Sequence, residues 1–485
     1  MKLVILVFIF AIKFNISAQP AISWGPEIKV ADGLLYSNIR PRVCVSADGN
    51  PLVLFGKGTE GYLFVSKGNG STFETPISIL PPNLQTYLSY WTGPDFASAG
   101  DTIIAAFKAL PFETGKIYIV RSVDGGLTFS DTVRVDSHET GRVWFPAIDM
   151  DINGNTLLTY MAHEGTDINP HYIYSKSIDG GLTYSPEIDI DGSVPGEACD
   201  CCPAEVVIKG NEEVILYRNN DADIRDIYAI YSSDGGLSFP TYENVDQMNW
   251  NINYCPSTGP DGVFVPNGLV TTFASKGSGY NRCYVSNNST SGGISFVENL
   301  MLTPPTNING KQIYPRIANE GNTLVVAWAE AETSNNEVFC AISTDGTLTQ
   351  LNDTKHQVNL ITTGSQTNPD LVVKGNEIHL VYQDYNSGAV IYRKGTLSGV
   401  SLNELEKKTV LYPNPIFQNE TIIIEGVEND LILKDVKITN ILGELISFEG
   451  TISNNRLEIK LDKKIGKGTY RIELSEKHNY SFVVQ

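Results

Sequence analysis

The sequence predicts an all-β protein in which a four-stranded unit recurs about every 55 residues, and three observations support this class. An eight-residue motif occurs three times at an even pitch, at Ser122–Phe129, Ser177–Tyr184 and Ser232–Phe239. The chain of 485 residues has 43 glycines and 41% hydrophobic residues, which is typical of many short strands joined by tight turns. A proline opens a short apolar run in each unit, at positions 41, 94, 146, 203, 260, 315 and 369.

Each octet, such as SVDGGLTF, is predicted to be a turn between two strands rather than a catalytic site. An aspartate can accept hydrogen bonds from the amides of its own loop, and the two glycines allow positive φ angles. The Thr or Ser hydroxyl can close the loop, and no nucleophile stands beside a base. We therefore assign a structural role to Asp124, Asp179 and Asp234.

A four-stranded unit at this pitch predicts a β-propeller in residues 20–398, with seven blades, or six if one proline unit is absorbed elsewhere. The seventh unit ends near residue 396 without an octet. The segment Ile22–Val30 resembles the strand that follows each octet. We expect this N-terminal strand to complete the last blade, which would remove an exposed edge from the ring.

The two ends of the chain differ from the repeated region. Residues 1–19 have Lys2, an apolar run and small residues near Ser17, which is the pattern of a secretory signal peptide. The run is too short to span a bilayer, and we expect no membrane-spanning segment elsewhere. Residues 399–410 are predicted to be a linker. Residues 411–485 alternate apolar and polar positions and predict a small β-sandwich.

The formal net charge of −20 limits the partners of the protein. A strongly acidic surface repels phosphate backbones, so we expect no nucleic-acid binding. It is compatible with a neutral ligand, a metal ion, or an anion held in a local basic pocket.

The connections between blades and the loops between second and third strands share one face, and they are rich in arginine and aromatic residues. Arginine pairs bidentately with a carboxylate and aromatic rings stack on sugars, so this face suits a carboxylated glycan. Alternatively, the aromatic side chains pack between blades and the arginines neutralise an acidic surface. The predicted ligand-binding face comprises Arg42, Trp91, Arg142, Trp144, His163, Arg225, Asp226, Trp250 and Tyr314.

Four of the seven cysteines are expected to lie close together near the start of neighbouring inner strands, namely Cys199, Cys201, Cys202 and Cys255. Because the chain is exported, we expect a disulfide from the Cys199–Cys202 loop to Cys255, with a second bridge as an option. Copper or zinc on these thiols and Asp200 is the alternative. We assign no metal ligand and no cofactor.

The octet S-x-D-x-G-x-T-[FWY] resembles the Asp-box of bacterial sialidases and BNR-repeat proteins. This resemblance covers residues 20–398 and implies a propeller in which the Asp-boxes lie away from the catalytic centre. The family uses three arginines on the substrate carboxylate, a tyrosine nucleophile activated by a glutamate, and an aspartic acid. Arg40 in NIRP resembles the first arginine without the following isoleucine, and the acid's loop holds only Glu60. The catalytic candidates that the resemblance implies are Arg40, Arg316, Tyr254 and Glu205.

The tail resembles the type A sorting domain of type IX secretion. The motifs that carry this resemblance are LYPNP at Leu411–Pro415, the strand pair in Asp435–Ile446, and KGTYRIEL at Lys467–Leu474. The resemblance implies a Bacteroidetes-type origin and the type IX secretion machinery as a partner. It places the mature protein in the medium or on the outer cell surface.

Two functions follow from these patterns. The first is a sialidase-like propeller that recognises glycans or another extracellular ligand on its connection face and hydrolyses them as an exo-sialidase. The second is a non-catalytic propeller that binds protein or another ligand, with the cysteines as disulfides or a metal site. A pair of carboxyl groups near the axis, beside converging arginines, would distinguish the enzyme from the binding protein.

Overall fold

The computed structural model divides the chain into two compact units at residue 400. In the first unit it describes residues 21–33, 38–58, 60–165, 167–266, 268–288 and 295–398. In the second unit it describes residues 410–412, 421–425, 427, 433–440, 444–453, 456–461, 465–475 and 478–484. The predicted signal peptide, and the predicted linker apart from residue 410, lie outside the described residues.

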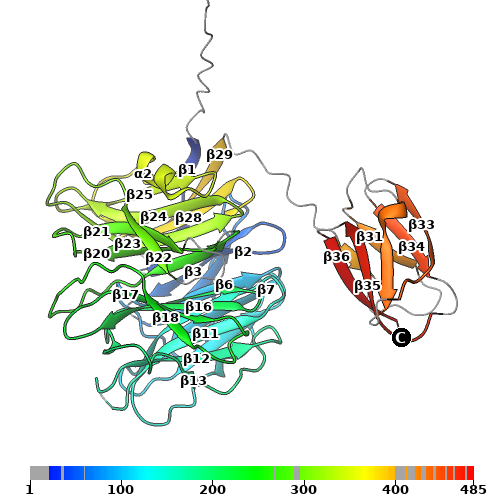
Figure 1. Cartoon of the computed structure of the whole chain (residues 1–485). Helices are drawn as coiled ribbons and strands as arrows, with labels where there is room; N and C mark the ends of the chain where they lie inside the picture. Colours follow the sequence, from blue (N-terminus) through cyan, green and yellow to red (C-terminus); the bar gives the residue numbers. More distant parts are fainter. Residues whose placement is uncertain are drawn as a thin grey trace, which may run out of the picture. The chain divides into compact units, whose positions relative to one another are not determined.

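The first unit consists of antiparallel sheets in chain order (Figure 1). Sheet 1 contains β2 (Asn38–Val45), β3 (Pro51–Lys57), β4 (Tyr62–Lys67) and β5 (Ile77–Ser78). Sheet 2 contains β6 (Asp95–Ala99), β7 (Thr102–Lys108), β8 (Ile117–Ser122) and β9 (Val133–Arg134). Sheet 3 contains β10 (Val143–Met150), β11 (Thr156–Ala162), β12 (His171–Ser177) and β13 (Ile188–Asp189).

The remaining sheets of this unit repeat the pattern. Sheet 4 contains β14 (Glu197–Ala198), β15 (Glu205–Lys209), β16 (Glu212–Asn220), β17 (Ile227–Ser232) and β18 (Thr241–Asn244). Sheet 5 contains β19 (Asp261–Val265), β20 (Gly268–Ser275), β21 (Arg282–Asn288) and β22 (Phe296–Met301). Sheet 6 contains β23 (Lys311–Glu320), β24 (Thr323–Ala331), β25 (Asn336–Ser343) and β26 (His356–Gln357), with α2 (Leu348–Asp353) before β26. Sheet 7 contains β27 (Gln366–Lys374), β28 (Glu377–Asp384), β29 (Ala389–Ser398) and β1 (Ala21–Ala31).

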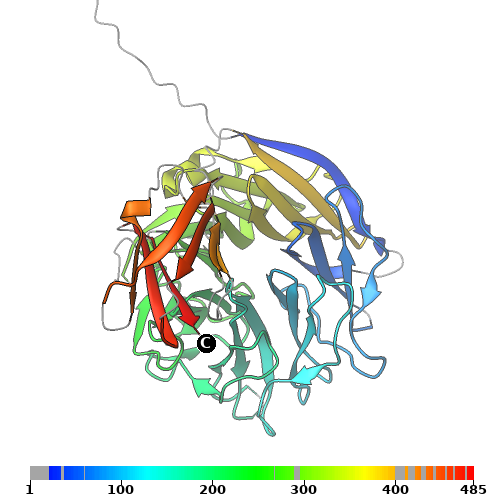
Figure 2. The ribbon, with the colours of Figure 1, turned by 90° about the vertical axis from the view of Figure 1, so that its right-hand side faces the viewer.

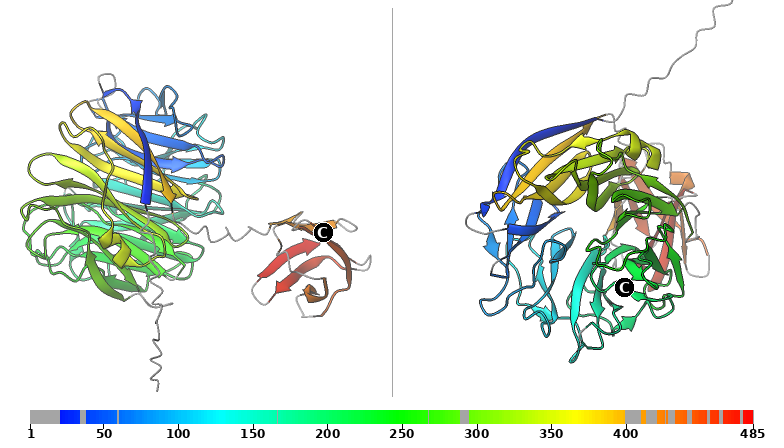
Figure 3. Two further views of the ribbon diagram at one scale, coloured as in Figure 1. Left: turned by 90° about the horizontal axis from the view of Figure 1, so that it is seen from above. Right: turned by 90° about the vertical axis from the view of Figure 1, so that its left-hand side faces the viewer.

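Apolar packing between successive sheets makes this unit a ring. The inner strands are buried on both faces, as in β24, where every residue is buried. Core clusters of this unit join neighbouring sheets, and one cluster joins sheet 7 to sheet 1 through Tyr392 and Phe55. Figures 2 and 3 show the sheets arranged around a common axis. The β-propeller prediction is confirmed, and seven blades is our interpretation of the seven sheets in the described part of the chain.

The N-terminal strand β1 completes sheet 7. It pairs antiparallel with β29 from Ala21 opposite Ser398 to Ala31 opposite Val390. Trp24 packs against the core cluster between sheets 6 and 7. The dark-blue strand lies beside the amber β29 in Figure 2. The expected closure by an N-terminal strand is confirmed, and it gives β29 a partner on its outer edge.

The three octets form the same turn between the third and fourth strands of sheets 2, 3 and 4. The Asp124 carboxylate accepts hydrogen bonds from the Thr128 amide at 2.9 Å and the Thr128 hydroxyl at 2.6 Å. Asp179 and Asp234 make the equivalent contacts within their own turns. The Thr128 hydroxyl bond is the main cause that lowers the pKa of Asp124 to about 2. These contacts agree with the turn geometry predicted for the three aspartates.

The octets also pack each sheet against its predecessor. Gly236 has φ of 82°, and an added Cβ would lie 1.8 Å from Tyr174 Oη in β12. Phe239 places its ring 4.7 Å from the ring of Tyr174. The second glycine therefore provides both the left-handed backbone and the close approach between sheets 3 and 4.

The second unit holds two antiparallel sheets with one shared apolar core, including Ile424, Ile438 and Ile472. One sheet contains β30 (Val410–Tyr412), β31 (Thr421–Glu425), β34 (Arg456–Leu461) and β33 (Phe448–Ser453). The other contains β32 (Lys437–Asn440), β35 (Gly468–Ser475) and β36 (His478–Val484), and η1 (Leu433–Asp435) precedes β32. This arrangement is the predicted β-sandwich. In the described residues of both units, no helix has the length and apolarity needed to cross a membrane.

Candidate functional site

The connections that lead into the inner strands surround a small pocket in the propeller unit. Its cavity has a volume of about 40 Å³. The wall combines arginines, aromatic rings and the prolines that open the repeats. The residues that line it are Arg40, Arg42, Trp91, Pro203, Ala204, Thr258, Gly259, Pro260, Tyr314, Pro315, Arg316, Asn368 and Pro369. We call it the axial pocket.

Irregular backbone at the start of the inner strands shapes this pocket. Arg40, Tyr314 and Asn368 each directly precede a proline and have φ between 51° and 54°. The strand register shifts at these positions, as between Ile39 and Arg42. Left-handed backbone at a residue other than glycine is costly, and β-bulges redirect side chains near functional sites. The inner strands β2, β23 and β27 therefore have regular pairing except at the bulged residues that border the pocket.

Two of the three pocket arginines are neutralised by buried carboxylates. Arg316 Nη1 lies 2.6 Å from Glu205 Oε2, and Arg316 Nε lies 3.0 Å from Asp370 Oδ1 and 3.2 Å from Asp261 Oδ2. Arg42 Nε lies 3.0 Å from Asp95 Oδ1. These two side chains are held in ion pairs, so their charge is largely balanced within the protein.

Arg40 differs from the other two. It is 6% exposed, and its Nη1 donates to Asn368 Oδ1 at 3.1 Å. Among the described residues, its Nε has no hydrogen-bond partner and no carboxylate forms an ion pair with its guanidinium. Burial and the neighbouring charge of Arg42 lower the pKa of Arg40 to about 9. An anion in the pocket would compensate this charge.

The axial carboxylates also connect neighbouring sheets. Asp95, Asp261 and Asp370 each follow a repeat proline and accept a hydrogen bond from a backbone amide of the next sheet, at 2.7–2.9 Å. Burial raises the pKa of Asp261 and raises that of Glu205 well above its ordinary value, against the opposing effect of Arg316. These acids are part of the framework beneath the pocket.

The structure brings together three of the four catalytic candidates. Arg40 and Arg316 line the axial pocket, and Glu205 lies behind it in contact with Arg316. Tyr254 is 59% exposed and lines a different cavity. Tyr314 of the predicted ligand face is the tyrosine that lines the axial pocket, together with Arg42 and Trp91.

Three residues of the predicted ligand face lie instead in packed surroundings at one end of sheet 3. Arg142 stacks on Trp144 at 4.6 Å and forms ion pairs with Glu113 and Asp167. Trp144 is buried, and its Nε1 contacts Met161 Sδ at 3.2 Å. Burial lowers the pKa of His163 to about 4, so its ring is neutral at pH 7. For these residues the packing alternative describes the observed contacts.

A second cavity, of about 560 Å³, lies along the loop between β18 and β19. Asp226 orders this loop by accepting the Trp250 amide at 3.0 Å and the Asn249 amide at 3.1 Å. Arg225 Nε donates to Ile252 O at 3.1 Å. The cavity is lined by Asp223, Asn249, Trp250, Asn251, Ile252, Asn253, Tyr254, Lys276, Gly277 and Gly279.

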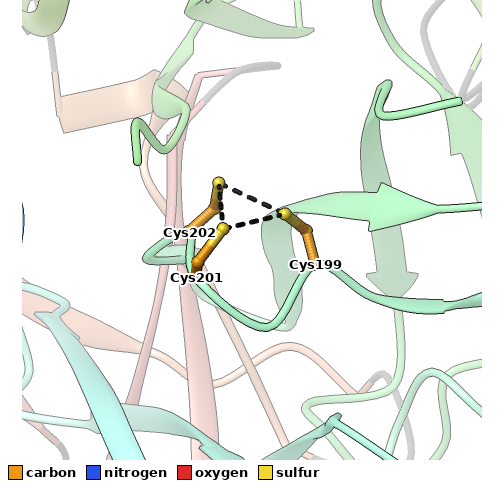
Figure 4. Close-up of side chains that lie close together, drawn as sticks. All are labelled: Cys199, Cys201 and Cys202. Carbon is orange, nitrogen blue, oxygen red and sulfur yellow. Dashed lines mark hydrogen bonds between the residues drawn. The ribbon is translucent and has the colours of Figure 1, made fainter. Parts of the chain in front are cut away.

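The cysteine prediction is confirmed for one bridge. Cys201 and Cys255 form a disulfide that joins the β14–β15 loop to the β18–β19 connection. Cys199 and Cys202 are buried free thiols, with Sγ atoms 3.4 Å apart. Figure 4 shows the sulfurs of Cys199, Cys201 and Cys202 converging. Their spacing is short enough to hold a metal ion, but the Cys201 sulfur is engaged in the disulfide.

Some residues of the axial region were not predicted. The signal for Asp95, Asp261 and Asp370 was present, because an aspartate follows the repeat proline in three units. Asn368 carries no comparable signal, since its role depends on an unusual backbone and on Arg40 from sheet 1. The partner of a residue in another sheet cannot be read from spacing within one repeat.

Comparison with known families identifies the tail. Residues 410–484 match the secretion system C-terminal sorting domain. The sequence prediction for this module is confirmed, and the protein is exported to the medium or the outer cell surface. No curated protein matches the chain.

Solved structures with a similar fold have low sequence identity. A Dyadobacter fermentans protein of unknown function is 13% identical, with a TM-score of 0.50, and the match covers 78% of this chain and 99% of that chain. A Penicillium chrysogenum α-L-arabinanase complexed with arabinobiose is 15% identical, with coverage of 66% and 98% and a TM-score of 0.45. A Trypanosoma rangeli sialidase in complex with the inhibitor DANA is 12% identical, with coverage of 66% and 56% and a TM-score of 0.43. The first of these matches supports the fold and carries no function.

Proposed function

We propose that the exported propeller binds glycans that carry a carboxylate, and that the axial pocket receives this group. The observation that carries the proposal is Arg40, a buried guanidinium at the pocket wall that Asn368 contacts through one nitrogen. A carboxylate would offer two acceptors to this planar donor and balance its charge.

The size and lining of the pocket also favour this ligand. A cavity of about 40 Å³ accommodates a carboxylate or a few atoms of a ligand, while the rest of a sugar would lie above it. Trp91 and Tyr314 at the wall provide apolar surfaces beside the charge. A charged group flanked by aromatic rings is a suitable site for one acidic sugar residue.

Recognition is favoured over hydrolysis by the position of the acids. Glycoside hydrolysis needs two carboxyl groups on either side of the scissile bond. Among the described residues that line the axial pocket, none is an aspartate or a glutamate. Glu205, Asp261 and Asp370 lie behind the arginines and are engaged in ion pairs.

The test measures binding of N-acetylneuraminic acid, glucuronic acid and glucose to the full chain by calorimetry. We expect the two acids to bind and glucose not to bind. Arg40→Gln should weaken binding of the acids at least tenfold, which corresponds to about 1.4 kcal/mol. Arg40→Lys keeps the charge without the planar donor pair, so its affinity for the acids should lie between those of the wild type and Arg40→Gln.

Arg134→Gln is the matched control, since this arginine of β9 pairs with Asp136 and Glu139 outside the pocket. Equal binding of acidic and neutral sugars, or unchanged binding in Arg40→Gln, would contradict the proposal. A fluorogenic sialoside is assayed in parallel. Turnover that disappears in Arg40→Gln would make the protein a hydrolase of the same ligand class.

A further inference from the structure

The loop at Cys199–Cys202 places two free thiols next to a disulfide. Backbone bonds from the Cys201 and Cys202 amides to Cys199 O close a tight turn. Cys199 Sγ consequently lies 3.6 Å from Cys201 Sγ and 3.4 Å from Cys202 Sγ (Figure 4). These are contact distances between sulfurs, so a thiolate at Cys199 would face a disulfide sulfur directly.

The surroundings of Cys199 are positively charged. Arg225 Nη1 donates to Cys199 Sγ at 3.0 Å. Arg218 is fully buried, and its guanidinium donates to the backbone carbonyls of Thr258, Arg225 and Ala274. Asp200 Oδ1, on a half-exposed side chain, lies 4.0 Å from Arg225 Nη1. In the described residues, no carboxylate forms an ion pair with Arg218, so an anion nearby is favourable. A thiolate at Cys199 would accept the Arg225 hydrogen bond and would be stabilised by the charges of Arg225 and Arg218.

Hydrogen bonding distinguishes the two free thiols. The sulfurs of Cys199 and Cys202 are hydrogen-bonded to each other, and this contact, together with Arg225, lowers the pKa of Cys199 despite burial. Burial raises the pKa of Cys202. One member of the pair is therefore the better nucleophile and the other the better proton holder.

We propose that Cys199, Cys201, Cys202 and Cys255 form a thiol–disulfide exchange site, in which Cys199 attacks the Cys201–Cys255 disulfide. The geometry supports this because Cys199 contacts both Cys201 and Cys202, and the cluster contains a disulfide and two thiols. The site is independent of the proposed binding of glycans.

The exchange needs no external oxidant or reductant. In the first step Cys199 loses its proton to solvent, its thiolate forms a bond to Cys201 Sγ, the Cys201–Cys255 bond breaks, and Cys255 leaves as a thiolate that takes a proton from solvent. In the second step Cys202 loses its proton to solvent and attacks Cys199 Sγ, the Cys199–Cys201 bond breaks, and Cys201 leaves as a thiolate that takes a proton from solvent. The product is a Cys199–Cys202 disulfide with Cys201 and Cys255 free, and the total number of thiols is unchanged.

The two forms differ in what they expose and connect. Cys255 is exposed, whereas Cys199 and Cys202 are buried. Exchange would therefore release a reactive thiol at the surface for small extracellular thiols and disulfides. It would also separate two loops that run into the axial pocket at Pro203 and Thr258.

The test follows Cys255 in the purified full chain without added thiol. Samples are incubated with N-ethylmaleimide, denatured, digested and analysed by mass spectrometry. We expect Cys255 to become alkylated from a starting state with five free thiols, the seven cysteines less one disulfide. Cys199→Ser should slow this reaction at least tenfold. Cys283→Ser, a buried free cysteine of β21, is the matched control and should leave the rate unchanged.

Cys202→Ser provides a second variant if Cys199→Ser does not fold. It permits the first step and should trap a Cys199–Cys201 disulfide with Cys255 alkylated. The proposal is overturned if Cys255 is not alkylated in the wild type, or if it is alkylated at the same rate in the wild type and in Cys199→Ser. It is also overturned if the wild type contains two stable disulfides, or if native mass spectrometry finds a metal ion on four reduced cysteines.

Discussion

Two sets of aspartates recur along the propeller, and they differ in where their hydrogen-bond donors come from. Those of the octets, such as Asp124, lie at the surface and accept hydrogen bonds from their own turn. Those of the inner strands, such as Asp370 and Asp149, are buried or nearly so and accept an amide from the next sheet. The pKa of Asp124 is lowered to about 2 by the Thr128 hydroxyl bond, and burial raises that of Asp149 to about 7.

The comparison shows what repetition in a sequence indicates. A turn whose aspartate accepts hydrogen bonds from its own loop needs particular residues at fixed positions nearby in the chain. Such a turn therefore appears in the sequence as a repeated octet. A carboxylate that connects two sheets needs only an amide presented by the next repeat, so its neighbours vary. Arg40 differs from both sets, because neither its own turn nor a neighbouring sheet supplies a carboxylate for its charge among the described residues. This unbalanced charge distinguishes the axial pocket from the rest of the propeller.

Removing an inner-strand aspartate should have the largest effect. Asp370→Ala leaves the buried Val43 amide without its acceptor and takes a carboxylate from Arg316. Loss of one partner of a buried ion pair costs about 3–5 kcal/mol. We expect a decrease of that size in the unfolding free energy of the propeller, measured by urea denaturation.

Two further variants separate the hydrogen-bond acceptor of Asp370 from its charge and provide a surface control. Asp370→Asn retains an oxygen acceptor for the Val43 amide without the charge, so it should be less destabilising than Asp370→Ala. Asp131→Ala, at an exposed position of the β8–β9 connection, should change the free energy by less than about 0.5 kcal/mol. A loss below about 1 kcal/mol in Asp370→Ala would mean that this carboxylate does not hold the sheets together.

An intermediate effect is expected from the octet glycine that contacts the preceding sheet. Gly236→Ala places a methyl group against Tyr174 Oη at a backbone with φ of 82°. Gly154, in the turn between β10 and β11, has φ of 83° and no atom within 4 Å of an added Cβ. Both variants incur the cost of the left-handed backbone, about 1 kcal/mol, and only Gly236→Ala adds a clash of about 1–3 kcal/mol. Equal melting temperatures for the two variants would show that the octet does not depend on contact with Tyr174.

Much of the fold was predictable because each signal lies within one repeat. The octets, the prolines and the N-terminal strand at Ile22–Val30 gave the propeller and its closure. The motifs of the tail likewise gave the sorting domain, which the match over residues 410–484 confirms. In both cases the residues that carry the signal are close in the chain.

The candidate site was only partly predictable because its partners come from different sheets. Arg40 and Arg316 stood out as arginines in an acidic chain. Their difference became visible only with Asn368, Glu205 and Asp370 placed around them. Arg142 and Trp144 are also an arginine and an aromatic residue in a connection, the combination that predicts a sugar site. In the structure they instead pack against each other. Composition alone does not separate these two outcomes.

The last prediction concerns how the unfolding free energy depends on pH, and it tests the difference between the two sets of aspartates. The raised pKa of partly buried Asp149 means that its contribution to stability is present below about pH 4 and is lost as pH rises toward about 7. Asp149→Asn should remove that loss, so the stability of the variant relative to the wild type should increase by about 1–3 kcal/mol as pH rises from 4 to 7. The measurement is the unfolding free energy across this range.

Asp124→Asn should give the opposite slope. The lowered pKa of Asp124 means that its contribution is present above about pH 4 and is lost as pH falls through about 2. The wild type should therefore exceed this variant at neutral pH, and the gap should close on acidification. Two aspartate-to-asparagine variants in one propeller would then have pH profiles of opposite sign. Parallel profiles would show that burial and hydrogen bonding within the turn do not distinguish the two sets of carboxylates.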